Sequence, residues 1–530
     1  MLGSYTRNEY MLNKMYGDIL NLIREYMINL EHKNKFSMSS KPASQMTIEK
    51  LIEEASKSIN DLYLLIKREL AVRQLMDGST PAIYIKTEDL QIGIYYVLID
   101  LAVSLRAALV TENPFEKRFH LKNLLASISE GYKLLMNFGK QRKHSLWMLM
   151  EEDVKVLGDG ELLDEYNQIK SKLELFGDTE IDQNLRNLTL HYDNDMIKVY
   201  YATVNLNSAD NCNKKTCALF GLIQEMLLFS RKVDGNVKAK SGVDKPILYS
   251  PVKLDIKRNH REVNMIINQQ GKLQDVFKNI LPGMLNGLDS MADKDKRMEK
   301  IKNFIEMNAQ LSCSVPEIQN IGVLINNEML LLFMKLDLVA IVDAYLHSES
   351  DIEFAMNFRR VIVTKTSAIV HLYGYEKHEK DQSFWCLIKN MVPISNQPLI
   401  DEAGEIETLL SKLGNNKEEK TLRAIYVHLF DNSKHCGNIN KALESVEQLD
   451  PVIHVGEVML MLEVYKKITA FTRQLLDTLA KDSHEKNVES TQKIMDMTDD
   501  MKRKIIGSVL PDDVKKSFVE QMEKFKSMMK

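Results

Sequence analysis

Residues 185–195 combine three side chains that could act together on a phosphodiester. Their sequence, LRNLTLHYDND, places Arg186, Asn187 and His191 among apolar residues. On an α-helix, Asn187 and His191 share a face because they lie four residues apart. Arg186 lies about 140° further round the axis, and its long side chain can bend back to join them. The segment therefore predicts a fixed cation, an amide and a proton carrier over one small surface.

This combination suits the cleavage of RNA. A histidine that titrates near neutrality can take a proton from the 2′-OH or give one to the departing 5′ oxygen. The planar fork of an arginine can bind the scissile phosphate and stabilise its developing negative charge. Such a reaction needs no metal, and we expect no cofactor, because Cys212 and Cys217 lack the second pair that would complete a zinc site. One histidine cannot easily serve both sides of the phosphate, so a second would be required.

A second Arg-x4-His pair, Arg423 and His428, follows the first at an offset of 237 in the numbering. Of the 12 histidines, only His191 and His428 have an arginine five residues before them. The same offset holds without a gap for other positions: Asp100 and Asp337, Glu116 and Glu353, Trp147 and Phe384, and Asp164-Glu165 and Asp401-Glu402. A constant register over some ninety residues indicates a tandem duplication.

The duplication predicts three parts. The first helical domain spans residues 1–240, the second spans 246–480, and a C-terminal helical extension covers 481–530. Residues 233–251, rich in Gly, Pro and Ser, are expected to form the linker between the two copies. The extension has no counterpart in the first copy. Its simplest interpretation is a pair of helices that pack against each other.

Composition favours an all-α fold. The chain of 530 residues has only 22 glycines and 11 prolines, and apolar residues recur at helical spacing. We expect two tandem helical bundles in a pseudo-two-fold arrangement, with residues 90–110, apolar on nearly all sides, in a central helix. The most apolar run, residues 329–346, is interrupted by Lys335, Asp337 and Asp343, which predicts a buried helix instead of a membrane span.

Charge and cysteine usage limit the class of protein. With 44% hydrophobic and 27% charged residues the chain is globular, and its net charge of −4 means that RNA would need a local basic patch. The five cysteines are scattered and odd in number, which indicates reduced thiols. The chain starts without a basic-then-apolar signal pattern. We expect a cytoplasmic protein with no membrane partner.

The sequence Arg-Asn-x-x-x-His near the start of a late helix resembles the HEPN superfamily, with its R-x4–6-H signature. In that family two helical bundles pair so that their signature segments line one cleft, and many members are metal-independent ribonucleases in antiviral defence or toxin systems. The resemblance implies that Arg186, Asn187 and His191 join Arg423 and His428 in one composite site within a single chain. The second copy departs from the pattern, because Ala424 stands where the first copy has Asn187.

Basic residues near the two signatures could hold an RNA backbone: Lys198, Lys214, Lys215, Lys434 and Arg473. For any one of them, a solvated surface position is the simpler interpretation. Two further basic groups, Arg118 with His120 and Arg359 with Arg360, lie near corresponding positions and are interpreted as basic surface on one helix. Besides RNA, the expected partners are an inhibitor or regulatory protein at the C-terminal extension, and homodimer formation is left open.

Two functions compete. The first is an endoribonuclease that cleaves single-stranded RNA by attack of the 2′-OH; the second is a non-catalytic, HEPN-like adaptor that binds a nucleotide, RNA or a protein. An intact Arg/His pair in both copies favours the enzyme. Ala424 and the acidic net charge favour the adaptor.

Overall fold

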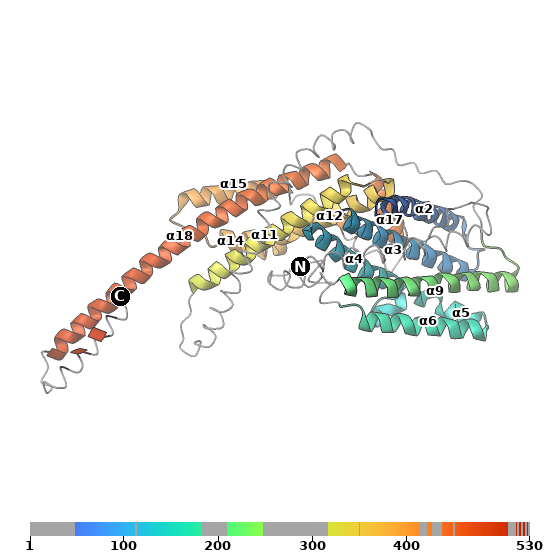
Figure 1. Ribbon diagram of the computed structural model, residues 1–530, viewed down its shortest axis with the longest axis horizontal. Helices are drawn as coiled ribbons and strands as arrows, with labels where there is room; N and C mark the ends of the chain where they lie inside the picture. Colours follow the sequence, from blue (N-terminus) through green and yellow to red (C-terminus); the bar gives the residue numbers. More distant parts are fainter. Residues whose placement is uncertain are drawn as a thin grey trace.

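Every regular element in the described part of the chain is a helix. The computed structural model describes residues 48–111, 114–182, 209–246, 316–348, 350–413, 421–423, 425–426, 437–448, 451–506 and a few positions between 516 and 527. No strand occurs among these residues, so the prediction of an all-α protein is confirmed (Figure 1).

The helices fall into two runs along the chain. The first run contains α2 (Ile48–Leu75), α3 (Ala82–Val110), α4 (Pro114–Leu135), η2 (Gly139–His144), η3 (Met148–Met150), α5 (Glu151–Val156), α6 (Gly160–Thr179) and α9 (Ala209–Ser241). The second run contains α11 (Pro316–Leu346), α12 (Asp351–Leu372), α13 (Lys377–Asp381), α14 (Phe384–Lys389), α15 (Gln397–Leu413), α17 (Gly437–Gln448) and α18 (Pro451–Ile506). In Figure 1, α6 and α9 lie at one end of the molecule, α15 and α18 lie at the other, and α3, α4, α11 and α12 lie between them.

Helix α3 is the centre of the core, as its sequence predicts. Leu90, Ile94, Tyr95 and Leu101 are all fully buried, although they point in different directions around the helix axis. By length and composition Ala82–Ala108 could cross a membrane, but its most apolar stretch is entirely covered by protein. Helix α11, which contains the apolar run 329–346, is buried in the same way. Both runs contribute to one continuous hydrophobic core.

The described helices recur at the offset found in the sequence. Helix α12 matches α4 at both ends with the offset of 237, and α11 covers nearly all the positions equivalent to those of α3. In α6 the core side chains Leu162, Tyr166, Ile169, Leu173 and Phe176 correspond at this offset to Leu399, Ala403, Ile406, Leu410 and Leu413, which are the buried positions of α15. The same positions of the repeat therefore face the core in both runs.

The last helix of each run departs from this register by one residue. The buried residues Ile223, Val233 and Val237 of α9 correspond to the buried residues Met461, Phe471 and Leu475 of α18 at an offset of 238. The two runs therefore differ by one residue in the length of the chain between the signature segment and the last helix. The side chains of α18 still face the core because every position of this helix is displaced by the same single residue relative to the offset of 237.

Two segment boundaries differ from the sequence-based expectation. Helix α9 continues to Ser241, with Val233 and Val237 in the core, so the expected linker cannot begin at residue 233. The helix ends where Gly242 adopts a φ of +68°, a conformation that favours glycine. At the other end, α18 runs unbroken through residues 480 and 481, so the C-terminal extension begins within a helix that also belongs to the core.

Ion pairs between α3–α4 and α11–α12 join the two runs. Lys122 of α4 contacts Asp337 of α11 at 2.6 Å, and Arg359 of α12 contacts Asp100 of α3. Lys122 and Arg359 occupy equivalent positions of the repeat, and so do Asp100 and Asp337. Reciprocal pairs of this kind are the contacts that a two-fold relation between similar units would make.

The second arginine of α12 strengthens the Asp100 site. Arg360 donates to the Asp100 carboxylate and main-chain carbonyl, both at 2.8 Å, and to Ser104 Oγ at 2.6 Å. Arg359 also donates to the hydroxyl of Tyr96. Burial alone would raise the pKa of Asp100, but the two guanidinium groups hold it below its usual value. Arg359 and Arg360 were expected on a basic surface, and that prediction is wrong, since both are buried against α3.

His120 was also expected on a basic surface, and for this residue the prediction is wrong, whereas the side chain of Arg118 lies outside the described part of the chain. His120 is buried on α4, and its pKa is lowered to about 3 because burial penalises the imidazolium and Arg360 repels it. The apolar neighbours on this face of α4 outweigh the polarity of the ring. The periodic pattern of the helix, more than its charges, decides which face is buried.

We predict that Asp100→Asn destabilises the protein by about 3–5 kcal/mol, because it leaves two buried guanidinium groups without a carboxylate. The matched control is Asp337→Asn, whose partner Lys122 can swing its ammonium toward solvent, so a smaller loss is expected. Chemical denaturation of both variants measures the difference. Since the pKa of Asp100 is depressed, its contribution is present above pH about 4 and is lost as the pH falls through the folded-state value. Equal losses in the two variants would contradict the central role of Asp100.

Candidate functional site

Most of the predicted catalytic residues lie outside the described residues. This applies to Arg186, Asn187, His191 and His428, and to the expected RNA-binding residues Lys198 and Lys434. Arg423 is described and lies in the helical residues 421–423. The structure therefore locates the second signature through Arg423 and through Ile425 and Tyr426.

Arg423 lies against α12. Its Nε donates to Ser367 Oγ at 2.9 Å, and the side chain is half-buried. Burial lowers the pKa of Arg423, while Tyr375 and Glu379 act in the opposite direction. An arginine remains charged under these conditions. Anchoring at Nε fixes the plane of the guanidinium, so that its two terminal nitrogens have a defined direction.

Tyr426, one helical turn after Arg423, is buried against the same helix. Its hydroxyl shares a hydrogen bond of 3.0 Å with Ser445 of α17, and it interacts electrostatically with Arg359. Ser367 and Arg359 lie about two turns apart on α12. The described part of the second signature segment thus follows α12 toward the ion pairs that join α12 to α3.

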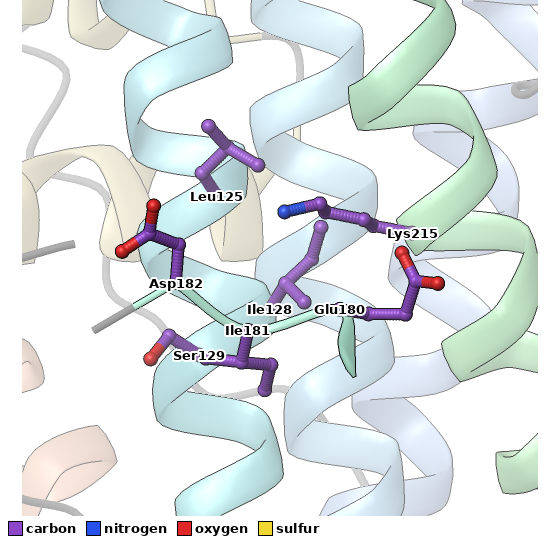
Figure 2. Close-up of a pocket in the computed structure, with 7 residues that line it drawn as sticks. All are labelled: Leu125, Ile128, Ser129, Glu180, Ile181, Asp182 and Lys215. Atoms are coloured by element: carbon purple, nitrogen blue, oxygen red, sulfur yellow. The ribbon is translucent and has the colours of Figure 1, made fainter. Parts of the chain in front are cut away.

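The first signature segment is preceded by a small pocket. Residues Glu180, Ile181 and Asp182, which follow α6, line it together with Leu125, Ile128 and Ser129 of α4 and Lys215 of α9 (Figure 2). Lys215 is half-buried, and the exposed Lys214 forms a distant ion pair of 3.9 Å with Glu180. Two of the five expected RNA-binding residues therefore lie next to the chain that leads to Arg186.

Arg473 does not belong to this group. It is exposed on α18, which packs against α11 and α15, whereas α9 packs against α3 and α6. Lys214 and Lys215 on the one side and Arg473 on the other would therefore contact different parts of any bound RNA.

The second half has a buried polar cluster where the first half has the pocket. Ile128 and Ser129 correspond at the repeat offset to Lys365 and Thr366, and both of these are fully buried. The Lys365 ammonium donates to His454 Nδ1 at 2.9 Å and to the Glu457 carboxylate. Because an ammonium can only donate, Nδ1 of His454 accepts this hydrogen bond, and it also lies 3.3 Å from the Glu457 carboxylate. Sequence reasoning missed this cluster, although a lysine at the position of an apolar residue in the other copy was a usable signal.

We predict that Glu457→Gln lowers the free energy of unfolding by about 2 kcal/mol, because it removes the carboxylate that compensates a buried ammonium. Adding Lys365→Met to that variant should recover most of the loss, since methionine fills a similar volume without charge. A double-mutant cycle by chemical denaturation measures the coupling. Additive losses would show that the two side chains stabilise the protein independently.

Comparison with known proteins gives no relative. No protein-family model, no curated protein and no solved structure matches the chain.

Proposed function

We propose that the chain contains two similar helical domains, 1–240 and 246–480, related by a pseudo-two-fold axis and resembling HEPN bundles. Three observations support this: the common order of the helices, the matching buried positions of α6 and α15, and the reciprocal pairs Lys122–Asp337 and Asp100–Arg359. The axis would pass between α3–α4 and α11–α12, where these pairs lie.

We propose that the protein is a metal-independent endoribonuclease that cleaves single-stranded RNA at a composite site between the two domains. The supporting observation is that Arg423 contacts Ser367 and that Tyr426 interacts with Arg359, both on α12. In the first half, residues 180–182 reach the pocket beside α4, the repeat equivalent of α12. Helix α12 contacts α3 and α4 contacts α11, so segments that follow α4 and α12 in this way would converge on the same interface.

Each signature residue then has a role. One histidine, His191 or His428, takes the proton from the 2′-OH, whose oxygen attacks the adjacent phosphorus. The bond to the 5′ oxygen breaks, and the other histidine protonates that leaving group, which gives a 2′,3′-cyclic phosphate and a 5′-OH. Arg186 and Arg423 neutralise the phosphate in the transition state. Such an enzyme would act in the cytoplasm, in antiviral defence or a toxin system.

We expect the purified protein to cut single-stranded RNA in EDTA and to leave 2′,3′-cyclic or 3′-phosphate ends. DNA and 2′-O-methyl RNA of the same sequence should survive because they lack the nucleophile. His191→Ala and His428→Ala should each lower the rate by at least about 10²-fold, the usual effect of losing a general acid or base. Since Ala424 stands where the first copy has Asn187, the loss of His191 should be the larger. A double histidine variant as active as the wild type would end this proposal.

Ser367 provides a second test, because it holds Arg423 without contacting the phosphate. Ser367→Ala should lower kcat about tenfold, the effect expected from losing one hydrogen bond to a charged group. Ser367→Thr keeps the hydroxyl and is the matched control, with activity near that of the wild type. Single-turnover kinetics on a short RNA measure both. A change in KM alone, with kcat constant, would place Arg423 in substrate binding and not in stabilisation of the transition state.

A non-catalytic adaptor is the second candidate. Met497 and Met501 lie one turn apart on α18 and are 70% and 60% exposed, which suits a helix that binds a regulatory protein. An adaptor would bind through this surface and leave RNA intact under all conditions.

A further inference from the structure

Charged side chains from four helices meet where the ends of α3 and α11 lie near the starts of α12 and α4. On one side of this junction, Arg106 of α3 pairs with Glu353 of α12 at 2.9 Å, and both side chains are buried. At the offset of 237 the corresponding residues are Asp343 of α11 and Glu116 of α4. These two acids repel each other. The second side of the junction therefore needs a positive charge from another residue.

His347, directly after α11, provides that charge. Its Nδ1 lies 3.0 Å from the main-chain oxygen of Asp343 and 3.2 Å from the Asp343 carboxylate. Both neighbours of Nδ1 are acceptors, so Nδ1 carries a proton, and a second proton on Nε2 gives the charged ring. The hydrogen bond with Asp343, assisted by the charge of Glu116, outweighs burial and raises the pKa of His347 from 6.5 to about 9.

Arg106 also contacts His347. Its Nη1 donates to the main-chain oxygen of His347 at 3.4 Å, while its Nε contacts Glu353. The charged groups around His347 are therefore Asp343 on its own helix, Glu116 on α4, Arg106 on α3 and, through Arg106, Glu353 on α12. Among these residues, a protonated His347 gives two cations for three acids, whereas a neutral His347 leaves Arg106 alone with all three. Loss of the proton adds repulsion to the contact between α11 and α4.

We propose that His347 is a proton-dependent clamp between the two runs of helices, which holds α11 against α4 while it is protonated and releases them when it is neutral. The side chain is 42% exposed, so the ring exchanges its proton with solvent while the protein stays folded. The contact between Arg106 and Glu353 has no such control, because an arginine stays charged and Val110 stands at the position that corresponds to His347. Only one side of the junction responds to pH.

The clamp closes in acid and opens in alkali. Because the pKa of His347 is raised in the folded protein, its contribution to stability is present in full below about pH 6.5 and is lost as the pH rises through about 9. Burial and Asp343 raise the pKa of Glu116 as well, so Glu116 also holds its proton more tightly in the folded state. Both groups act in the same direction, and opening the clamp releases protons.

An NMR titration of the full-length protein with ¹³C-labelled histidine tests the charge on the ring. The signal of His347, identified by its loss in His347→Arg, should titrate near pH 9. In Asp343→Asn the midpoint should fall by at least about one pH unit, because the main hydrogen bond to the imidazolium is lost. A wild-type signal that titrates at the ordinary value of a histidine would overturn the proposal.

Chemical denaturation tests whether the proton stabilises the fold. Between about pH 7 and about pH 10, the equilibrium constant for unfolding should rise at least about tenfold more in the wild type than in His347→Arg, whose charge is permanent. His378→Arg is the matched control and should follow the wild type, since His378 is 71% exposed and lies 3.5 Å from Glu376 on the surface. The same pH dependence in the wild type and in His347→Arg would contradict the clamp.

Glu116→Gln shows whether the proton acts between helices. His347 and Asp343 belong to the same end of α11, so their hydrogen bond alone could stabilise that helix without joining it to α4. With Glu116 uncharged, α11 and α4 no longer repel each other when His347 is neutral, and the pH dependence of unfolding should shrink by at least about threefold. A pH dependence equal to that of the wild type would reduce His347 to a local contact within α11 and overturn its role between the two runs.

Discussion

Asp100 holds the two halves of the molecule together at the point where α3 and α12 meet. Its carboxylate receives Arg359 and Arg360 at once, and Tyr96 and Ser104 satisfy further donors of the same guanidinium groups. Two buried cations are tolerated beside each other only because one ionised carboxylate lies between them. The direction of α12 is thereby fixed relative to α3. Everything that rests on α12, including Arg423 through Ser367, takes its position from this contact.

The contact between Lys122 and Asp337 lies at the offset of 237 from the contact between Asp100 and Arg359, and the two contacts differ in chemistry. A lysine replaces the arginine, and the neighbouring position is Asn123 where the second copy has Arg360. A second difference lies nearby. Arg106 pairs with Glu353 at 2.9 Å, but the corresponding residues Asp343 and Glu116 are both acids. Beside Asp343 and Glu116 the positive charge comes from His347. The hydrogen bond between His347 and Asp343 raises the pKa of His347 to about 9. At corresponding positions of this interface, the two runs of helices therefore balance charge with different residues.

The sequence was sufficient for those features that periodicity and repetition encode. The central position of α3 followed from its apolar residues, and the matching ends of α4 and α12 followed from the constant offset of 237 in the sequence. The burial of Arg359 and Arg360 could not be predicted in the same way, because a helical pattern shows which face is charged and not whether an acid from a distant helix covers it. The cluster around Lys365 depends similarly on His454 and Glu457, which belong to a helix far along the chain. Long-range pairing of charges decides such sites, and one sequence does not display it.

The length of α18 has a mechanical consequence. Its first part belongs to the core through Val458, Met461, Tyr465 and Ile468, and its last part carries the exposed Met497 and Met501. The 56 residues form one helix about 80 Å long, without a proline or a break after its first residue. A rod of this kind has no joint at which a displacement could be absorbed. A force applied near Met497 and Met501 would therefore be transmitted along the helix to Tyr465 and its neighbours in the core. His454 and Glu457 lie on the first turns of the same helix, so it would reach them as well.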